Sequence, residues 1–163
     1  MDEFLSVKIR PAREGDIAVL AAMIAEMPLW QRYGVDRARA EHLLRGAMER
    51  AELVLVAETE DVPVGVVWAL VQGAFGISGY IRLLAVRPGW QRKGVGSQLM
   101  AAAEREIARM ASSVFLLTSE FNVDAQRFYE RLGYQRVGAI PDYVIQGVAE
   151  LIYYKPLWSQ GCS

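Results

Sequence analysis

Short apolar runs and stretches of helical periodicity alternate along the chain, and their order predicts a mixed α+β fold. Strand-like runs are expected at 7–10, 53–57, 62–71, 80–86, 114–118, 134–137 and 150–155. Apolar residues recur at helical spacing from Asp16 onward and over 36–49, 94–110 and 124–132. The resulting order, β-α-α-β-β-β-α-β-α-β-β, favours a central sheet flanked by helices.

Turn and cap residues separate these elements. Asp16 is expected to cap the first helix, and Pro28 and Gly34 interrupt the chain before the second. The segment 58–61 predicts a tight turn that joins two strands in a hairpin. Gly133 suits the left-handed position after a helix end. Because no repeat, linker or low-complexity segment divides the sequence, residues 1–163 are expected to form a single domain.

Composition narrows the classes of function. The 163 residues are 53% hydrophobic and carry a net charge of −1, which fits a globular domain with a sizeable core and argues against a nucleic-acid binder. His42 and Cys162 are the only histidine and cysteine, so no disulfide framework, no Cys- or His-based metal site and no Ser-His-Asp triad is expected. Cys162 is interpreted as a tail residue. Neither a secretory signal nor a membrane span is expected, and the expected location is the cytoplasm.

The strongest local signal is a glycine-containing turn between a predicted strand and a predicted helix. The start of a helix exposes backbone amides that can hold a phosphate. Gly94 and Gly96 leave room for a ligand, and Arg92 and Lys93 add positive charge beside it. The turn is neither a GxxxxGK[ST] loop nor a full GxGxxG, since Leu99 stands where the last glycine belongs. Taken alone, the segment also fits a plain strand-to-helix turn with solvated basic residues.

A second signal lies in the predicted helix 124–132. Phe128 fits its core face, and Tyr129 projects about 100° away. A phenol with a pKa of about 10 can donate a proton to a departing thiolate, whose thiol has a pKa of about 8.5. The alternative is a packing residue whose hydroxyl is satisfied within the protein.

Together, the two signals resemble the GNAT superfamily of acetyl-CoA-dependent N-acetyltransferases. The resemblance rests on Gln91-x-x-Gly94-x-Gly96 after Leu84-Ala85-Val86, and on Asn122 followed by Phe128-Tyr129-x-x-Leu132-Gly133-Tyr134. The opening segment 9–16 and the closing segment 150–157 also match. The resemblance implies a single-domain fold with a central mixed, mostly antiparallel twisted sheet, in which the fourth and fifth strands splay apart.

The resemblance also implies acetyl-CoA as the cosubstrate and coenzyme A as the product. The residues it assigns to the cofactor are Leu84, Ala85, Val86, Gln91, Arg92, Lys93, Gly94, Val95, Gly96, Ser97, Asn122, Ala125, Phe128 and Tyr129. The backbone of 84–86 would pair with the pantetheine arm, the amides of 91–97 would hold the pyrophosphate, and Asn122 would bond the arm. Tyr129 would act as the general acid while a primary amine of a small molecule or peptide attacks the thioester directly.

The sequence departs from the family pattern at the expected general base. Many members carry a glutamate on the fourth strand, where this chain has Tyr80-Ile81-Arg82, so Glu120 becomes the catalytic candidate for that role. Acceptor contacts are expected from Trp30, Tyr33, Tyr80 and Tyr143. Aromatic faces suit a cationic amine, although rim packing explains Trp30 and Tyr143 equally well.

Two other classes of function stay open at this point. The missing strand carboxylate is compatible with a non-catalytic acyl-CoA-binding sensor, and the helix faces are compatible with an interaction module that takes no ligand. The family resemblance allows a homodimer, but no residue pattern demonstrates one. The sequence does not identify the amine acceptor.

Overall fold

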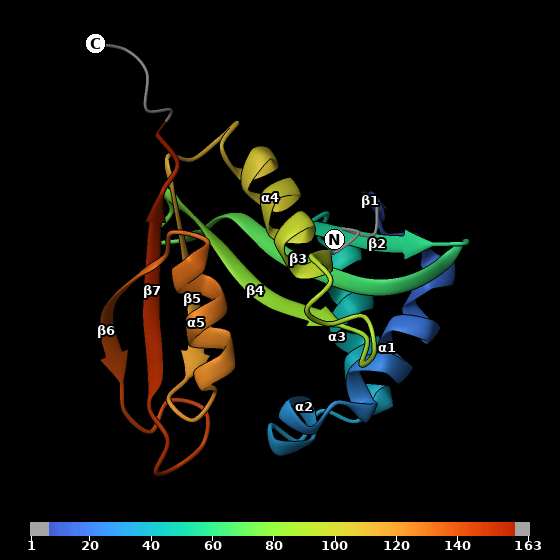
Figure 1. Cartoon of the computed structure of the whole chain (residues 1–163), viewed down its shortest axis with the longest axis horizontal. Helices are drawn as coiled ribbons and strands as arrows, with labels where there is room; N and C mark the ends of the chain where they lie inside the picture. The colour runs from blue at the N-terminus through green and yellow to red at the C-terminus, as the bar shows by residue number, and fades with distance from the viewer. Residues whose placement is uncertain (1–6, 159–163) are drawn as a thin grey trace. The chain divides into compact units, whose positions relative to one another are not determined.

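The computed structural model describes residues 7–158, and its strands there form one sheet in the order β1-β2-β3-β4-β5-β7-β6 (Figure 1). The strands are β1 (Lys8–Pro11), β2 (Leu53–Thr59), β3 (Val62–Ala74), β4 (Ser78–Val86), β5 (Ser113–Ser119), β6 (Gln135–Ile140) and β7 (Glu150–Pro156). The α-helices are α1 (Ile17–Glu26), α2 (Pro28–Arg32), α3 (Arg37–Glu49), α4 (Val95–Ile107) and α5 (Val123–Arg131), and a 3-10 turn, η1 (Glu14–Asp16), precedes α1. The predicted α+β class is confirmed.

Strand directions confirm the mixed character of the sheet. The pairs β1–β2, β2–β3, β5–β7 and β6–β7 are antiparallel, whereas β4 and β5 run parallel. The parallel register joins Gly79–Ile81 to Val114–Leu116 and ends at Ile81. A register that covers only the first part of β4 agrees with the expected splaying of the fourth and fifth strands.

The chain divides into two compact units. Within the described residues, the first unit comprises 7–69 and 83–103, and the second comprises 70–82 and 104–158. The strands β3 and β4 and the helix α4 each contribute residues to both units.

Close packing in the first unit depends on a glycine. Residues 63–69 of β3 are all buried, and α4 begins beside this strand. A Cβ atom on Gly65 would lie 2.9 Å from Cδ1 of Leu99 and 3.2 Å from the carbonyl oxygen of Ala85. Only a residue without a side chain therefore allows the start of α4 and the end of β4 to approach β3 this closely.

A buried ion network joins the N-terminal elements of the first unit. The guanidinium of Arg10 donates two hydrogen bonds, of 2.7 and 2.8 Å, to the carboxylate of Asp16 and a third, of 2.8 Å, to Glu58. Asp16 also accepts from the amide of Arg13 at 2.7 Å. The predicted helix-capping role of Asp16 is wrong, because its carboxylate makes no cap hydrogen bond to α1 and binds Arg10 and Arg13 instead.

Two predicted breaks in the chain turn out differently. Pro28 begins the short helix α2 instead of only interrupting the chain, because its fixed φ angle suits the first position of a helix. The gap expected at 72–79, between the third and fourth strands, shrinks to a turn at 75–77. Phe75 and Gly76 take positive φ values of 56° and 73° there, which lets β3 return tightly into β4.

The second unit is built around the β5, β7 and β6 strands, with α5 beside them (Figure 1). The phenol of Tyr153 on β7 donates to Glu130 of α5 at 3.0 Å. On β4, Gly79 leaves space for Ile107 of α4, whose Cγ2 would lie 2.5 Å from a Cβ at that position. Gly79 pairs with Val114 and Tyr153 pairs with Leu116, two residues further along β5. Residues two apart on a strand share a face, so α5 and the end of α4 lie on the same face of the sheet.

Helix length bears on the expectation about membranes. Across residues 7–158, no helix has the length and apolar character that crossing a bilayer requires. Helices α3 and α4 have 13 residues each, fewer than the roughly 20 of a membrane span. Cys162, interpreted from the sequence as a tail residue, lies outside the described residues.

Candidate functional site

The turn before α4, in the first unit, presents backbone amides at the start of a helix. Arg92 and Gly94 have positive φ angles of 61° and 82°, and the first helical hydrogen bond runs from the amide of Gln98 to the carbonyl of Gly94 at 3.1 Å. The amides of 95–97 precede that bond, so helix geometry leaves them without an acceptor inside α4. The first turn contains no acidic side chain, so nothing in it repels an anion.

The side chains of this turn differ in what they do. Arg92 and Lys93 are exposed, and the Lys93 ammonium lies 5.2 Å from the centre of the Trp90 ring. The side-chain amide of Gln91 donates to the carbonyl of Val86 at 3.1 Å. Gln91 therefore ties the turn back to the end of β4, a role that the sequence pattern did not reveal.

The end of β4 alternates in burial. Ala85 is buried, whereas Leu84 and Val86 are half-buried. After the strand, the amide of Arg87 donates to the carbonyl of Val64 at 2.8 Å. This bond anchors the chain to β3 immediately before it turns toward α4.

In the second unit, Asn122 is the N-cap of α5. Its Oδ1 atom accepts a hydrogen bond from the amide of Ala125 at 3.2 Å, and its own amide donates to the carbonyl of Ser119 at 3.0 Å. The cap uses the side-chain oxygen, so the Nδ2 group is the donor that a ligand can use. Sequence reasoning had assigned Asn122 only to the cofactor, although Asn before a helix is a familiar capping signal.

Tyr129 lies on α5 between two other aromatic rings. Its ring centre is 5.1 Å from that of Phe128 and 5.8 Å from that of Tyr134, both in edge-on arrangements. Burial raises the pKa of the Tyr129 phenol above its usual value. The expected core face of this helix is only partly covered, because Ala125, Phe128 and Leu132 are all half-buried.

The end of α5 fixes the neighbourhood of Tyr129. Gly133 has a φ angle of 93°, and the amide of Tyr134 donates to the carbonyl of Tyr129 at 3.0 Å. This is the Schellman arrangement that the sequence position of Gly133 predicted. The Tyr134 phenol donates to Glu104 at 2.9 Å, and Glu104 pairs with Lys155 at 2.9 Å.

The residues expected to contact the acceptor fall in both units. In the first unit, the ring centres of Trp30 and Tyr33 are 6.1 Å apart, and the buried Nε1 of Trp30 has no hydrogen-bond partner among residues 7–158. In the second unit, Tyr80 is half-buried and Tyr143 is 59% exposed.

Tyr80 is surrounded by groups that change its acidity. Burial raises the pKa of its phenol most strongly, nearby Arg82 lowers it, and the charges of Tyr143 and Glu150 raise it further. Tyr143 and Glu150 are therefore electrostatic neighbours of Tyr80.

The two carboxylates near the end of β5 have contrasting surroundings. Glu120, the catalytic candidate from sequence, is exposed, and its amide donates to the carbonyl of Ala149 at 3.0 Å. Glu150, which sequence reasoning missed, is only 4% exposed. Its Oε1 atom accepts a hydrogen bond from the Ser119 hydroxyl at 3.1 Å. Only the pairing of Ser119 with Glu150 across β5 and β7 reveals this contact.

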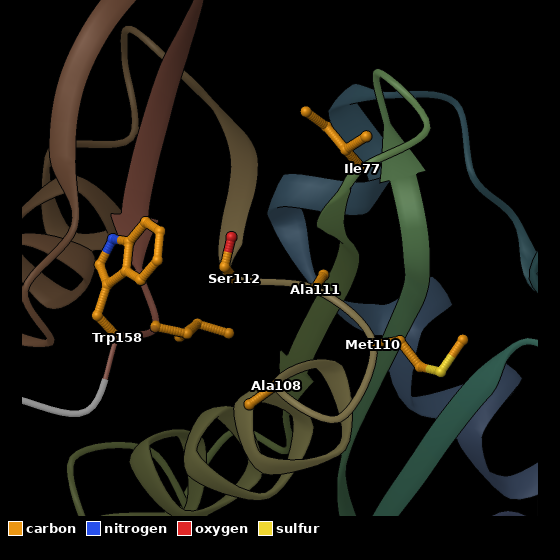
Figure 2. A pocket seen from close by; sticks show the side chains of 7 residues that line it. Ile77, Ala108, Met110, Ala111, Ser112 and Trp158 are labelled. Carbon is orange, nitrogen blue, oxygen red and sulfur yellow. The ribbon is translucent and has the colours of Figure 1, made fainter.

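A separate hollow of about 540 Å³ opens in the second unit (Figure 2). Its lining consists of Ile77, Ala108, Met110, Ala111, Ser112, Leu157 and Trp158. Figure 2 shows Trp158 and Ile77 on opposite sides of it. None of the predicted site residues lines this hollow.

Comparison with known proteins gives similarities in sequence and in fold. Residues 18–134 match the model of the Acetyltransferase (GNAT) family. An aminoglycoside 6′-N-acetyltransferase complexed with coenzyme A is 17% identical, with a TM-score of 0.76 over 95% of this chain and 99% of that one. The yncA protein of Salmonella typhimurium, solved with its cofactor acetyl-CoA, is 18% identical, with a TM-score of 0.75 over 98% of each chain. A ribosomal-protein-alanine N-acetyltransferase from Brucella melitensis is 21% identical, with a TM-score of 0.75 over 92% of this chain and 99% of that one.

The family match covers most of the chain, including the α4 turn and all of α5. The similarity to solved structures extends over more than nine-tenths of the chain. The motifs around Gly94 and Tyr129 thus lie inside the matched segment. The chain belongs to the acetyltransferase (GNAT) family.

Proposed function

We propose that this protein is an N-acetyltransferase that transfers the acetyl group of acetyl-CoA to a primary amine. The observation that carries the proposal is the start of α4, where the amides of 95–97 have no acceptor within the helix and no acidic residue accompanies them. The family match supports it. The balanced reaction is R–NH3⁺ + CH3CO–S–CoA → R–NH–CO–CH3 + HS–CoA + H⁺.

The residues present suit acetyl-CoA, which supplies an activated acyl group when it is bound. In the first unit, the amides of 91–97 would hold the pyrophosphate, with Arg92 and Lys93 adding charge from the exposed side of the turn. The backbone of 84–86 would pair with the pantetheine arm. Two proteins of similar fold were solved with coenzyme A and with acetyl-CoA, which supports this assignment.

The second unit carries the other residues that the family resemblance assigns to the cofactor. The Nδ2 group of Asn122 would donate to the pantetheine arm, because its Oδ1 atom is committed to the α5 cap. Ala125 and Phe128 are half-buried, so a ligand packed against them would bury the apolar surface that they still expose on α5. Burial of this apolar surface would add to the affinity.

Tyr129 is proposed as the general acid. As the C–S bond breaks, its phenol would give a proton to the sulfur, and the amine nitrogen would lose its protons to a base or to water. Proton transfer from a phenol of pKa about 10 to the conjugate base of a thiol of pKa about 8.5 costs about 2 kcal/mol. Burial raises the pKa of the Tyr129 phenol. Burial would also raise the pKa of a thiol beside it, which offsets the increase in this cost. A backbone N–H near Val86 would stabilise the developing oxyanion.

Glu120 stays the sequence-based prediction for the proton acceptor. Its exposure to solvent would allow it to act through a water molecule. The acceptors named for two proteins of similar fold, an aminoglycoside and a ribosomal-protein alanine, differ so widely that they do not narrow the acceptor of this chain.

A panel of primary amines tests the proposal, with thiol release from acetyl-CoA as the readout. We expect amine-dependent release, together with acetyl-CoA binding by calorimetry and a rise in unfolding temperature. A ligand at 100 times its Kd adds about 2.7 kcal/mol to stability. Binding without release for every amine would favour the sensor function, and the absence of binding would refute both.

A further inference from the structure

The strand registers of the second unit place a set of polar and aromatic residues on one face of the sheet. Tyr80 of β4 pairs with Phe115 of β5, and Ser119 of β5 pairs with Glu150 of β7. Side chains alternate along each strand, and directly paired residues point to the same face. Tyr80, Ser119 and Glu150 therefore share a face, opposite to the one on which Tyr153 contacts α5.

Glu150 is the buried carboxylate on this face. It is 4% exposed and accepts a hydrogen bond of 3.1 Å from the Ser119 hydroxyl, which is itself buried. The backbone of Glu150 is paired on both sides, with Ser119 of β5 and with Ile140 of β6. Its position is therefore set by two strands, and its side-chain oxygen is oriented by a neighbouring hydroxyl.

Ser119 connects this carboxylate to the start of α5. Its hydroxyl donates to Glu150, while its carbonyl accepts from the amide of Asn122 at 3.0 Å and from the side chain of Gln126 at 3.2 Å. One residue thus orients both the buried carboxylate and the cap residue proposed to bind the cofactor.

Two tyrosines of the second unit are more exposed than this carboxylate. Tyr143 is 59% exposed, Tyr80 is half-buried, and Glu150 is buried. Burial raises the pKa of Tyr80 most strongly, and the charges of Tyr143 and Glu150 add to this effect. A desolvated carboxylate favours a cation over a neutral group of the same shape, and aromatic faces do the same. Arg82 shares this face and is exposed.

We propose that Glu150, oriented by Ser119, receives the ammonium group of the amine acceptor. This assignment rests on the proposed N-acetyltransferase function. It places the acceptor carboxylate on β7, two strands away from β4, where the family pattern leads one to expect a glutamate and this chain has Tyr80. Glu150 thereby competes with Glu120 as the carboxylate that serves the amine.

Binding of a matched pair of probes tests this assignment without any need for turnover. The probes are 2-phenylethylammonium and its neutral isostere 2-phenylethanol, titrated by NMR into the full chain saturated with coenzyme A. The wild type should prefer the ammonium probe by on the order of tenfold, as expected for a hydrogen bond to a charged group. Glu150→Gln keeps an acceptor for Ser119 but removes the charge, so it should abolish the preference.

Three further variants separate the causes. Ser119→Ala keeps the charge and should retain most of the preference, and Glu106→Gln, on an exposed position of α4, should retain all of it. Glu120→Gln tests the competing carboxylate. The proposal is overturned if the wild type shows no preference, if Glu150→Gln keeps it, or if Glu120→Gln removes it instead.

The readouts keep the two proposals distinct. Unfolding temperatures of the variants, and coenzyme A affinity by calorimetry, show whether Glu150→Gln is folded and binds the cofactor. If Glu150→Gln unfolds, Glu150→Asp takes its place. Asp keeps the carboxylate on a shorter side chain, so Glu150→Asp should still prefer the ammonium probe, and loss of its preference with an intact fold would count against the proposal. An intact ammonium preference in a wild-type protein that acetylates no amine would refute the catalytic function and leave Glu150 as an ammonium-binding residue only.

Discussion

Tyr129 and Tyr134 are held together by the backbone that ends α5. The amide of Tyr134 donates to the carbonyl of Tyr129 at 3.0 Å, and their ring centres lie 5.8 Å apart. In a Schellman motif these two positions are brought together by the left-handed residue between them, here Gly133. The position of the proposed general acid is therefore coupled to the geometry of a helix end.

The first prediction concerns Tyr129→Phe. It removes the proposed proton donor and keeps the ring, so turnover should fall on the order of a hundredfold or more, while acetyl-CoA affinity stays the same. Steady-state kinetics with an active amine and calorimetry measure the two effects. Tyr154→Phe, on the half-buried ring of β7, is the matched control and should be close to wild type. Unchanged turnover in Tyr129→Phe would remove the tyrosine from the mechanism.

The second prediction concerns the pH above which kcat falls. A group with a raised pKa stays protonated to higher pH, and burial raises the pKa of Tyr129. The wild-type kcat should therefore hold up to a pH above about 10, the ordinary range of tyrosine. The measurement is kcat against pH. A fall in kcat at a lower pH that persists in Tyr129→Phe would be due to another group.

The third prediction concerns Gly133→Ala. The φ angle of 93° is unfavourable for any residue with a Cβ, although the added methyl itself would meet only Lys155 at 3.6 Å. We expect a loss of about 1–2 kcal/mol in unfolding free energy and a lower kcat, because the helix end that positions Tyr129 is strained. Urea unfolding and kinetics measure both effects.

Gly15→Ala serves as the control for Gly133→Ala. Among residues 7–158 and apart from its chain neighbours, no atom lies within 4 Å of a Cβ at Gly15, and its φ angle is not positive, so stability and kcat should both stay near wild type. If Gly133→Ala behaved like this control, the coupling of the helix end to Tyr129 would be wrong.

The fourth prediction concerns Gly65→Ala. An added methyl group would press on Leu99 and on the carbonyl of Ala85, and overpacking of this kind costs about 1–3 kcal/mol. Because the displaced elements are the start of α4 and the end of β4, acetyl-CoA affinity should fall along with stability. A Gly65→Ala protein that is less stable but binds acetyl-CoA normally would contradict the proposed role of this turn.

The fifth prediction is acid sensitivity that depends on Asp16. The Arg10 guanidinium is the main cause that holds the pKa of Asp16 below its usual range, and hydrogen bonding by Arg13 adds to it. The folded-state pKa is lowered, so the stabilisation is complete above the unfolded-state pKa of about 4 and is lost as pH falls through the folded-state value. Asp16→Asn should lower the unfolding temperature at pH 7 and flatten its decline below pH 4. An equally steep decline in Asp16→Asn would assign the acid sensitivity to other carboxylates.

Features set by neighbouring residues in the chain could be predicted from the sequence. The α4 turn and the Gly133 helix end depend on local spacing, and the structure places them as the patterns indicated. Tyr129 lies on the predicted helix, now α5. The strand carrying Gly65 was also predicted, although the meaning of that glycine was not, because Leu99 and Ala85 come from distant parts of the chain.

Features that depend on contacts between elements could not be predicted. Asp16 was expected to cap a helix, but Arg10, six residues earlier on β1, binds its carboxylate instead. The contact of Ser119 with Glu150 depends on the register of β5 against β7, which no local pattern specifies.

The connection between β6 and β7 has an evolutionary consequence. Its residues 141–147 are mostly exposed, yet β7 begins at Glu150, which is paired with strands on both sides. Insertions, deletions and substitutions in such a connection are tolerated because the paired strands hold their alignment without it. Over evolution, residues 141–147 can therefore change in length and sequence while the backbone of Glu150 keeps its place in the sheet.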